Sequence, residues 1–316
     1  MERDRTVDLM IAGQGAAGYA AALYAARYGL TLIVCGDTFG GETATGGMIE
    51  NYPGWPGIDG FDLMVKFKEQ VAANSVEILE SDLASVERSD DCFRSSLTDG
   101  TQVRSRAVLL ALGRDRRTLG LAHEREWIGR GISYCSTCDA PLYRGKVVAV
   151  VGGGNAAVDG AILSAQHAVR VYLLYRGERL ERPDAVLLEQ LRRQANVEVL
   201  LKTEVVELIG RDESGLEAIR ISRPLKGNDR LPVDGLFIEI GADPRAEIPT
   251  QLGVELNGTT KEVHVDRMMH TNIEGVFAAG DLTDGSGPLK QTITAAAQGA
   301  IAAFSAYHYL MGGASQ

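Results

Sequence analysis

The sequence predicts an α/β fold with two three-layer nucleotide-binding domains, the second inserted into the first. Near the N-terminus a strand, a glycine-rich turn, a helix and a second strand follow one another, and the same order returns in the middle of the chain. A short buried strand at 275–281 and a helical run from Gln291 to Tyr309 then indicate that the chain returns to the first domain. The 37 glycines among 316 residues fit many tight turns between strands and helices.

The first unit begins with an apolar strand from Thr6 to Ala12. The turn Gly13-Gln-Gly-Ala-Ala-Gly18 opens an alanine-rich helix to about Tyr28, and a second strand runs from Leu30 to Cys35. The first glycine permits the tight bend, the second lets backbone N–H groups approach a pyrophosphate, and the third lets the helix pack on the strand. This context favours a dinucleotide site over a glycine-rich core turn that binds nothing.

A ribose-binding acid is expected about 20 residues after such a turn, at the end of the second strand. Here that strand ends at Val34, Cys35 and Gly36, and the first acid lies just beyond them. Asp37 is therefore the candidate ribose contact.

The second unit repeats the pattern with the turn Gly152-Gly-Gly-Asn-Ala-Ala157. Its other elements are a strand at 146–151, a helix at 158–168 and a strand at 169–174, with a last strand from Gly235 into the turn 241–244. We expect the chain to cross between the domains at 107–117 and 235–246. The predicted Rossmann-like domains are 1–116 with 245–316, and 117–244.

Two of the four cysteines, Cys135 and Cys138, form a C-x-x-C pair. Such a pair at the start of a helix forms an easily reduced disulfide, whereas a zinc site needs a second pair that the sequence lacks. Asp139 follows directly and is a candidate proton donor or acceptor for dithiol exchange, or a cap of that helix. Cys35 and Cys92 are isolated in strand-like surroundings, which predicts two buried structural thiols.

The composition excludes several classes of protein. A formal charge of −10 argues against nucleic acid or an anionic membrane as a partner. The N-terminus, with two acids in its first four residues, predicts a strand and turn rather than a signal peptide. No apolar run approaches the roughly 18 residues needed to cross a bilayer, and four cysteines do not make a secreted scaffold, so we expect a cytoplasmic protein.

Taken together, these motifs resemble the low-molecular-weight thioredoxin reductases over essentially the whole chain. The matching segments are 13–18, Gly40-Gly41, Glu50-Asn-Tyr-Pro-Gly54, Ala111-Leu-Gly113, 129–139, 275–281 and Lys290-Gln291. The resemblance implies a homodimer that holds FAD and reduces thioredoxin or a similar disulfide protein. In this family the second cysteine, here Cys138, faces the flavin, Cys135 attacks the substrate disulfide, and Asp139 is the acid/base.

The resemblance also implies which residues hold FAD, with Asp281 near the ribityl chain and 290–292 beside the isoalloxazine ring. The implied FAD-binding residues are Gly13, Gly15, Ala16, Ala17, Gly18, Asp37, Gly40, Gly41, Glu42, Asn51, Ala111, Gly113, Gly280, Asp281, Lys290, Gln291 and Thr292.

The sequence departs from the family in the second domain, where NADPH binds. The retained remnant is Gly152, Gly154, Asn155, Ala156 and Arg176. Of the arginines that grip the 2′-phosphate only Arg176 matches, because Gly177 replaces the second and Glu181 stands where the third is expected. A carboxylate repels a phosphate, and each lost bidentate guanidinium contact costs about 1.5–3 kcal/mol, which predicts weak NADPH binding unless Arg179 or Arg182 compensates.

Several functions remain open from sequence alone. If NADPH binds weakly, the electron donor of a thioredoxin-reductase-like enzyme is ferredoxin, a second flavin, NADH or another reductant. Ordinary NADPH dependence is the alternative. A basic cluster at Arg114, Arg116 and Arg117 fits a solvated crossing loop better than a docking site for an acidic ferredoxin. A dithiol oxidase that uses oxygen, and an FAD-binding redox sensor without catalysis, are further alternatives.

Overall fold

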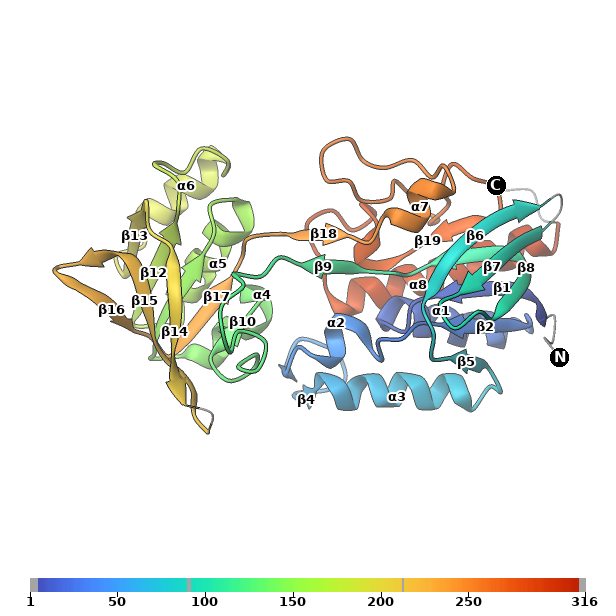
Figure 1. Cartoon of the computed structure of the whole chain (residues 1–316), viewed down its shortest axis with the longest axis horizontal. Helices are drawn as coiled ribbons and strands as arrows, with labels where there is room; N and C mark the ends of the chain where they lie inside the picture. Colours follow the sequence, from blue (N-terminus) through green and yellow to red (C-terminus); the bar gives the residue numbers. More distant parts are fainter. Residues whose placement is uncertain (1–4, 90–91, 212, 313–316) are drawn as a thin grey trace. The chain divides into compact units, whose positions relative to one another are not determined.

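The structure is a computed structural model that describes residues 5–89, 92–211 and 213–312 (Figure 1). The chain forms two compact units. Unit 1 takes its residues from 1–45, 58–115 and 243–316, and unit 2 takes its residues from 46–57 and 116–242. The segment 46–57, which the sequence-based boundaries place in the first domain, therefore groups with unit 2.

Unit 1 is built on a seven-stranded sheet of described residues in the order β5-β2-β1-β8-β7-β6, with β19 paired to β8. The strands β5, β2, β1, β8 and β19 run parallel, whereas β7 is antiparallel to both β8 and β6. The bounds are β1 Arg5–Ala12, β2 Leu32–Cys35, β5 Glu77–Leu79, β6 Leu83–Ser89, β7 Cys92–Leu97, β8 Gln102–Leu110 and β19 Val276–Ala278.

The helices of unit 1 bury small residues against one another and against this sheet. They are α1 Ala16–Arg27, α2 Gly41–Ala44, α3 Gly60–Ala72, α7 Glu247–Gln251, the short 3₁₀ turn η2 Gly280–Leu282 and α8 Thr292–Leu310. Helix α1 packs closely on α8 because Gly299 faces it: a Cβ there would lie 2.1 Å from the carbonyl oxygen of Ala17. This contact brings the first and last segments of the chain together around the start of α1.

Unit 2 contains a five-stranded parallel sheet in the order β10-β17-β11-β12-β13 and an antiparallel sheet β14-β15-β16. The strand bounds are β10 Ile132–Ser133, β11 Val147–Val151, β12 Arg170–Tyr175, β13 Val197–Leu201, β14 Val205–Arg211, β15 Gly215–Leu225, β16 Asn228–Pro232 and β17 Gly235–Ile238. The helices are α4 Ser136–Asp139, the 3₁₀ turn η1 Ala140–Tyr143, α5 Asn155–Ala165 and α6 Ala185–Arg192.

Two strand pairs complete the described elements. Strand β3 Met48–Ile49 pairs with β4 Ile58–Asp59, and β9 Arg114–Arg116 pairs with β18 Ala242–Pro244. The predicted crossing strand 107–117 is thus interrupted, because the chain turns at Gly113, whose φ of +71° lies in the left-handed region, between β8 and β9. The crossing segments themselves form the small sheet β9–β18.

Candidate functional site

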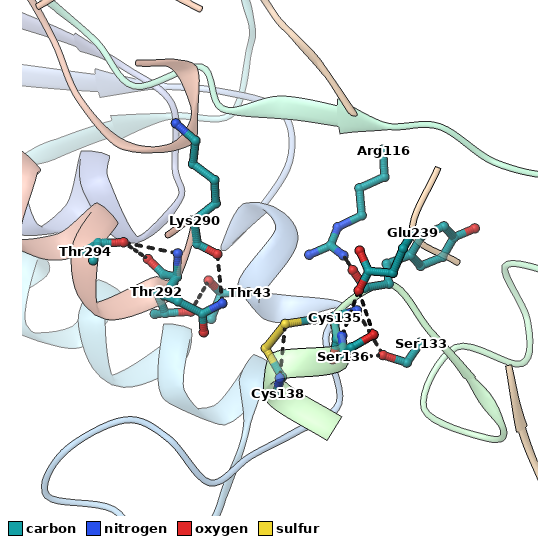
Figure 2. Close-up of a disulfide and its surroundings, with 12 residues drawn as sticks. Thr43, Arg116, Ser133, Cys135, Ser136, Cys138, Glu239, Lys290, Thr292 and Thr294 are labelled. Atoms are coloured by element: carbon teal, nitrogen blue, oxygen red, sulfur yellow. Dashed lines mark hydrogen bonds between the residues drawn. A yellow bond between two sulfur atoms is a disulfide. The ribbon is translucent and has the colours of Figure 1, made fainter. Parts of the chain in front are cut away.

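The two cysteines of the C-x-x-C pair form a disulfide in unit 2, at the start of α4 (Figure 2). Cys135 is the residue before the helix, and its sulfur accepts a hydrogen bond from the backbone N–H of Cys138 at 3.2 Å. The hydroxyl of Ser133 accepts from the backbone N–H of Cys135 at 3.0 Å. These bonds hold the backbone on both sides of Cys135.

Asp139, the last residue of α4, is buried, with 9% of its surface exposed. Burial raises the pKa of this carboxyl from 3.8 to about 6, and the charge of Glu50 adds to the rise. A hydrogen bond from Ser133 and the charge of Arg116 oppose it. A carboxyl group that titrates near neutral pH beside a dithiol is suited to hold and release the proton that thiol–disulfide exchange requires.

Arg116 is fixed by the segment that leads into the redox pair. Its guanidinium donates to the carbonyl oxygen of Tyr134 and lies 5.7 Å from the centre of that ring. The Tyr134 hydroxyl in turn donates to the buried carboxylate of Glu124, which also accepts the N–H groups of Leu119 and Leu121. Arg116 is therefore a neighbour of the redox turn rather than a free member of a basic patch.

The start of α1 in unit 1 has the form of a pyrophosphate cradle. The helix begins at Gly15 without a side-chain cap and without an acid in its first turn, and the space around a Cβ of Gly15 is open to 4 Å. Gly13 has a φ of +119°, and a Cβ there would lie 2.1 Å from the carbonyl oxygen of Ala111. Uncapped N–H groups and open space at a helix start fit the diphosphate of FAD.

Other predicted FAD residues converge on this cradle. A Cβ at Gly41 would lie 3.4 Å from the Cα of Gly15, and one at Gly280 would lie 2.9 Å from the Cβ of Ala17. Thr43 of α2 and Thr292 of α8 share a hydrogen bond of 3.1 Å. The glycine turn, the segment 40–44 and the C-terminal segment 280–292 therefore surround the same helix start.

Several predicted side chains have specific partners within their own unit. The ammonium of Lys290 lies 2.9 Å from Glu262 and donates to the carbonyl oxygen of Thr283, and Asp281 pairs with Arg114 at 3.1 Å. Gln291 begins α8 with a capping box that includes Thr294. Asp37 is exposed beyond β2, and its backbone N–H donates to Asp82. Asn51 belongs to unit 2, in the loop 50–56 that lines a shallow pocket of about 460 Å³.

Two buried glutamines were missed by the sequence-based reasoning. Gln14, inside the first glycine turn, donates to the carbonyl oxygen of Gly36 and accepts from the hydroxyl of Tyr19. Gln298 of α8 accepts the N–H of Gly280 at 2.7 Å and the hydroxyl of Thr283 at 3.2 Å. Gln14 binds the glycine that follows β2, and Gln298 binds Gly280 beside the cradle, but a polar residue in a turn or a helix gives no sequence signal of this kind without a known neighbour.

The second glycine turn, in unit 2, has different surroundings. Asn155, the first residue of α5, donates to Asp184 Oδ2 at 3.0 Å and accepts from the Asp184 backbone N–H at 2.9 Å. The ring of Tyr175 packs against the middle of the turn, since a Cβ at Gly153 would lie 2.1 Å from its Cε2. Arg176 is exposed, and Arg179 pairs with Glu181. Helix α5, like α1, begins at a glycine without a side-chain cap and without an acid in its first turn, but the carboxylate of Asp184 binds the side chain of its first residue.

Of the two isolated cysteines, only Cys35 agrees with the prediction of a buried thiol. Burial raises its pKa to about 12, so it stays a protonated, unreactive group. Cys92 is half-buried, contrary to the prediction, because it begins strand β7, where its sulfur lies 3.7 Å from a guanidinium nitrogen of Arg104.

Comparisons with known proteins agree with this fold and site. The family model of the pyridine nucleotide-disulphide oxidoreductases matches residues 7–299. A thioredoxin reductase of Mycoplasma genitalium is 35% identical over 96% of this chain and 95% of its own length. A 34.2 kDa protein in a rubredoxin operon of Clostridium pasteurianum is 33% identical over 99% of this chain and its whole length. The crystal structure of the Streptococcus pyogenes thioredoxin reductase superposes with a TM-score of 0.89, at 31% identity, over 98% of this chain and all of that one.

The chain is thus a flavin-dependent disulfide oxidoreductase with a redox-active cysteine pair. It belongs to the pyridine nucleotide-disulphide oxidoreductase family and is of the low-molecular-weight thioredoxin reductase type. Membership implies FAD as the cofactor, and the cradle at the start of α1 fits that group. None of the helices in the described part of the chain is long and apolar enough to cross a membrane.

Proposed function

We propose that this protein passes electrons from FAD to the Cys135–Cys138 disulfide and on to the disulfide of thioredoxin or a similar protein. The observation that carries the proposal is the buried Asp139 beside the pair, with its pKa raised to about 6. Such a group is of use to a reaction that moves protons with thiols, and of little use to a purely structural disulfide. The relatives that are named thioredoxin reductases support thioredoxin as the substrate.

Each residue of the redox turn has a distinct role in this proposal. Bound FAD supplies two electrons to the disulfide. Cys138 is the sulfur on the flavin side, and Cys135 attacks the disulfide of the protein substrate, forming a mixed disulfide that Cys138 resolves. Asp139, in its protonated form, donates its proton to the thiolate that leaves.

Unit 1 holds FAD in this account. The FAD diphosphate would lie at the start of α1, against Gly13, Gly15 and Gly18, and Asp281 and the run 290–292 would hold the rest of the cofactor. Supporting this, a Cβ at Gly18 would lie 1.9 Å from the carbonyl oxygen of Gly13, so helix and turn approach as closely as backbone allows. Unit 2 is then the second nucleotide-type domain, which carries the redox pair.

The electron donor in this proposal is a reductant other than NADPH: ferredoxin, a second flavin or NADH. The support is local to unit 2. Asp184 is bonded to Asn155 at the start of α5, and Glu181 pairs with Arg179, an arginine that the 2′-phosphate would need. Both carboxylates repel a phosphate.

Two relatives point to different donors. The Clostridium pasteurianum relative is named for a rubredoxin operon, which supports a small electron-carrier protein. An Arabidopsis thaliana relative, 35% identical over 96% of this chain, is named an NADPH-dependent thioredoxin reductase, which supports the alternative that this chain also uses NADPH. Measuring whether NADPH reduces the flavin separates these two alternatives, because the transfer of electrons from the redox pair to the protein substrate is the same in both.

The protein also acts as a cytoplasmic homodimer in this proposal. Tyr24 and Tyr28 of α1 and Phe304 of α8 are 45%, 36% and 39% exposed, and Tyr28 stacks on Tyr307 with 4.9 Å between ring centres. Exposed aromatic side chains on two packed helices favour contact with a second copy of the chain. Sedimentation of the Tyr28→Glu variant as a monomer, with wild type as a dimer, is the expected result.

A donor-independent experiment tests the disulfide reductase activity. The FAD-loaded enzyme is reduced anaerobically with a stoichiometric amount of dithionite and mixed with oxidised thioredoxin, and the new thioredoxin thiols are counted. We expect about one dithiol per reduced enzyme from wild type and from the control Cys92→Ser, and none from Cys135→Ser. Reduced wild-type enzyme that leaves thioredoxin and other protein disulfides oxidised would exclude the proposal.

A further inference from the structure

A carboxylate that follows strand β17 accepts hydrogen bonds from the first turn of α4, the helix at which the redox pair lies. Glu239 Oε1 accepts two hydrogen bonds from Ser136, the residue between Cys135 and the rest of α4 (Figure 2). The backbone N–H of Ser136 donates at 2.9 Å and its hydroxyl at 2.8 Å. Ser136 is buried, with 3% of its surface exposed, so these two donors are shielded from water.

The position of Glu239 is fixed by the central part of the parallel sheet. Glu239 follows β17, and its backbone N–H donates to the carbonyl oxygen of Val151 at 2.8 Å, at the end of β11. Its own carbonyl oxygen lies against the glycine turn, since a Cβ at Gly152 would be 2.3 Å away. The carboxylate therefore extends from a rigid strand end rather than from a loop.

Helix α5 leaves room for Ser136 in this arrangement. A Cβ at Gly160 would lie 2.5 Å from the hydroxyl oxygen of Ser136 and 2.9 Å from its Cβ. Only glycine at this position allows α4 to pack so closely on α5. The redox turn is thus held from two sides, by the strand end that carries Glu239 and by Gly160.

We propose that Glu239 is a positioning residue of the dithiol centre: through Ser136 it fixes the first turn of α4, and its negative charge disfavours the thiolate of Cys135. When the disulfide takes up two electrons the S–S bond breaks, and each sulfur then carries a proton or a negative charge. A carboxylate that is hydrogen-bonded to Ser136, the residue next to Cys135, repels that negative charge, so the protein with Glu239 is a stronger reductant than one without it.

Other charged side chains also act on this turn, and they have to be the same in every variant that is compared. Arg116 and Glu50 act on the buried Asp139, whose own charge changes near pH 6. Apart from the control, the substitutions therefore change only Glu239 and Ser136, and the readouts follow the reduced FAD-loaded enzyme from pH 5 to pH 9. None of these readouts depends on the electron donor or on the protein substrate.

The test compares Glu239→Gln, which keeps an acceptor oxygen but removes the charge, with Glu239→Ala, Ser136→Ala and the control Glu204→Gln, an exposed carboxylate of the same unit. In Glu239→Gln we expect the midpoint of iodoacetamide alkylation to move about one pH unit lower, with alkylation at pH 7 about threefold faster. The equilibrium with a dithiothreitol buffer should shift toward the reduced enzyme by up to about tenfold.

The Ser136→Ala variant keeps the charge and one hydrogen bond, so its alkylation midpoint should stay within about 0.3 pH unit of wild type. In Glu239→Ala the midpoint should fall as in Glu239→Gln, while hydrogen exchange at α4 becomes faster than in Glu239→Gln. If Glu239→Gln has the alkylation profile and the redox equilibrium of Glu204→Gln, the electrostatic role is overturned. If Glu239→Ala leaves exchange at α4 as slow as in wild type, the positioning role is overturned.

Discussion

Asn155 and Asp184 form a closed pair of hydrogen bonds at the start of α5: the Asn155 amide donates to the Asp184 carboxylate at 3.0 Å, and its oxygen accepts the Asp184 N–H at 2.9 Å. The same aspartate precedes the first residue of α6. The Asp184 carboxylate is thereby held beside the side chain of the first residue of α5, where its negative charge opposes a phosphate at that helix start. This relationship is the structural basis for expecting a donor other than NADPH.

A charge reversal at Glu181, where the family has an arginine that binds the 2′-phosphate of NADPH, tests that expectation. In Glu181→Arg a repulsive carboxylate becomes a guanidinium, and Arg179 loses its present partner. Since one such contact is worth about 1.5–3 kcal/mol, NADPH-driven flavin reduction should become at least about tenfold faster. The measurement is stopped-flow flavin absorbance. The control Glu189→Arg makes the same charge change on α6 and should leave the rate unchanged, and an equal gain in both variants would point to net charge alone.

Removal of the resolving cysteine should trap the reaction with thioredoxin. In Cys138→Ser the Cys135 thiolate still attacks the substrate disulfide, but no second thiol releases the product. A mixed disulfide with thioredoxin should therefore accumulate and run as one band on a non-reducing gel. Cys135→Ser should give no such band. Equal trapping by the two variants would reverse or remove the roles assigned to the two sulfurs.

The titration of Asp139 predicts a particular dependence of stability on pH. Its pKa is about 6 in the folded protein and 3.8 in the unfolded reference, so the folded state binds the proton more tightly between these values. Stability should therefore fall as pH rises from about 4 to about 6, by up to about 3 kcal/mol, and stay level above that range. In Asp139→Asn this fall should be absent when urea unfolding is measured across the same pH range.

Catalysis should depend on Asp139 in the same pH range. The protonated carboxyl is the proton donor, so the rate of thioredoxin reduction by pre-reduced enzyme should decline as pH rises above about 6. Asp139→Asn should lower the rate about 100-fold at pH 6 and flatten this limb of the profile. An Asp139→Asn variant with the wild-type profile would remove Asp139 from the mechanism.

The first glycine turn should be intolerant of a single methyl group. In Gly13→Ala the new Cβ would lie 2.1 Å from the carbonyl oxygen of Ala111, on a residue with a φ of +119°. The strain and overlap should destabilise the protein by about 3 kcal/mol and reduce the FAD content of the purified enzyme. Gly258→Ala is the control, because a Cβ there has open space to 4 Å. A Gly13→Ala enzyme with full FAD content would argue against the cradle.

Much of the fold follows from patterns that are local in sequence. The strand before Gly13 and the alanine-rich helix after it are visible because buried parallel strands are continuous apolar runs and glycine turns separate them from helices. The second helix was expected at 158–168 but spans Asn155–Ala165, because it begins within the glycine turn itself.

The candidate site was predictable only where a residue type reveals its chemistry. Cys135, Cys138 and Asp139 are adjacent in sequence and need no tertiary information, and their disulfide is present in the structure. Glu239 lies 103 residues from Ser136, and Asp184 lies 29 residues from Asn155. An isolated acid after a strand has no signature, so these pairs are found only when the sheet brings strand ends together.

The most direct test of this account is a reductant screen on the oxidised, FAD-loaded enzyme under anaerobic conditions. NADPH, NADH and reduced ferredoxin are each added at micromolar concentration, and the flavin absorbance is followed. We expect little bleaching by NADPH and full bleaching by one of the other donors, followed by thioredoxin reduction that requires Cys135. Rapid and complete bleaching by micromolar NADPH would contradict the account and establish an ordinary NADPH-dependent reductase.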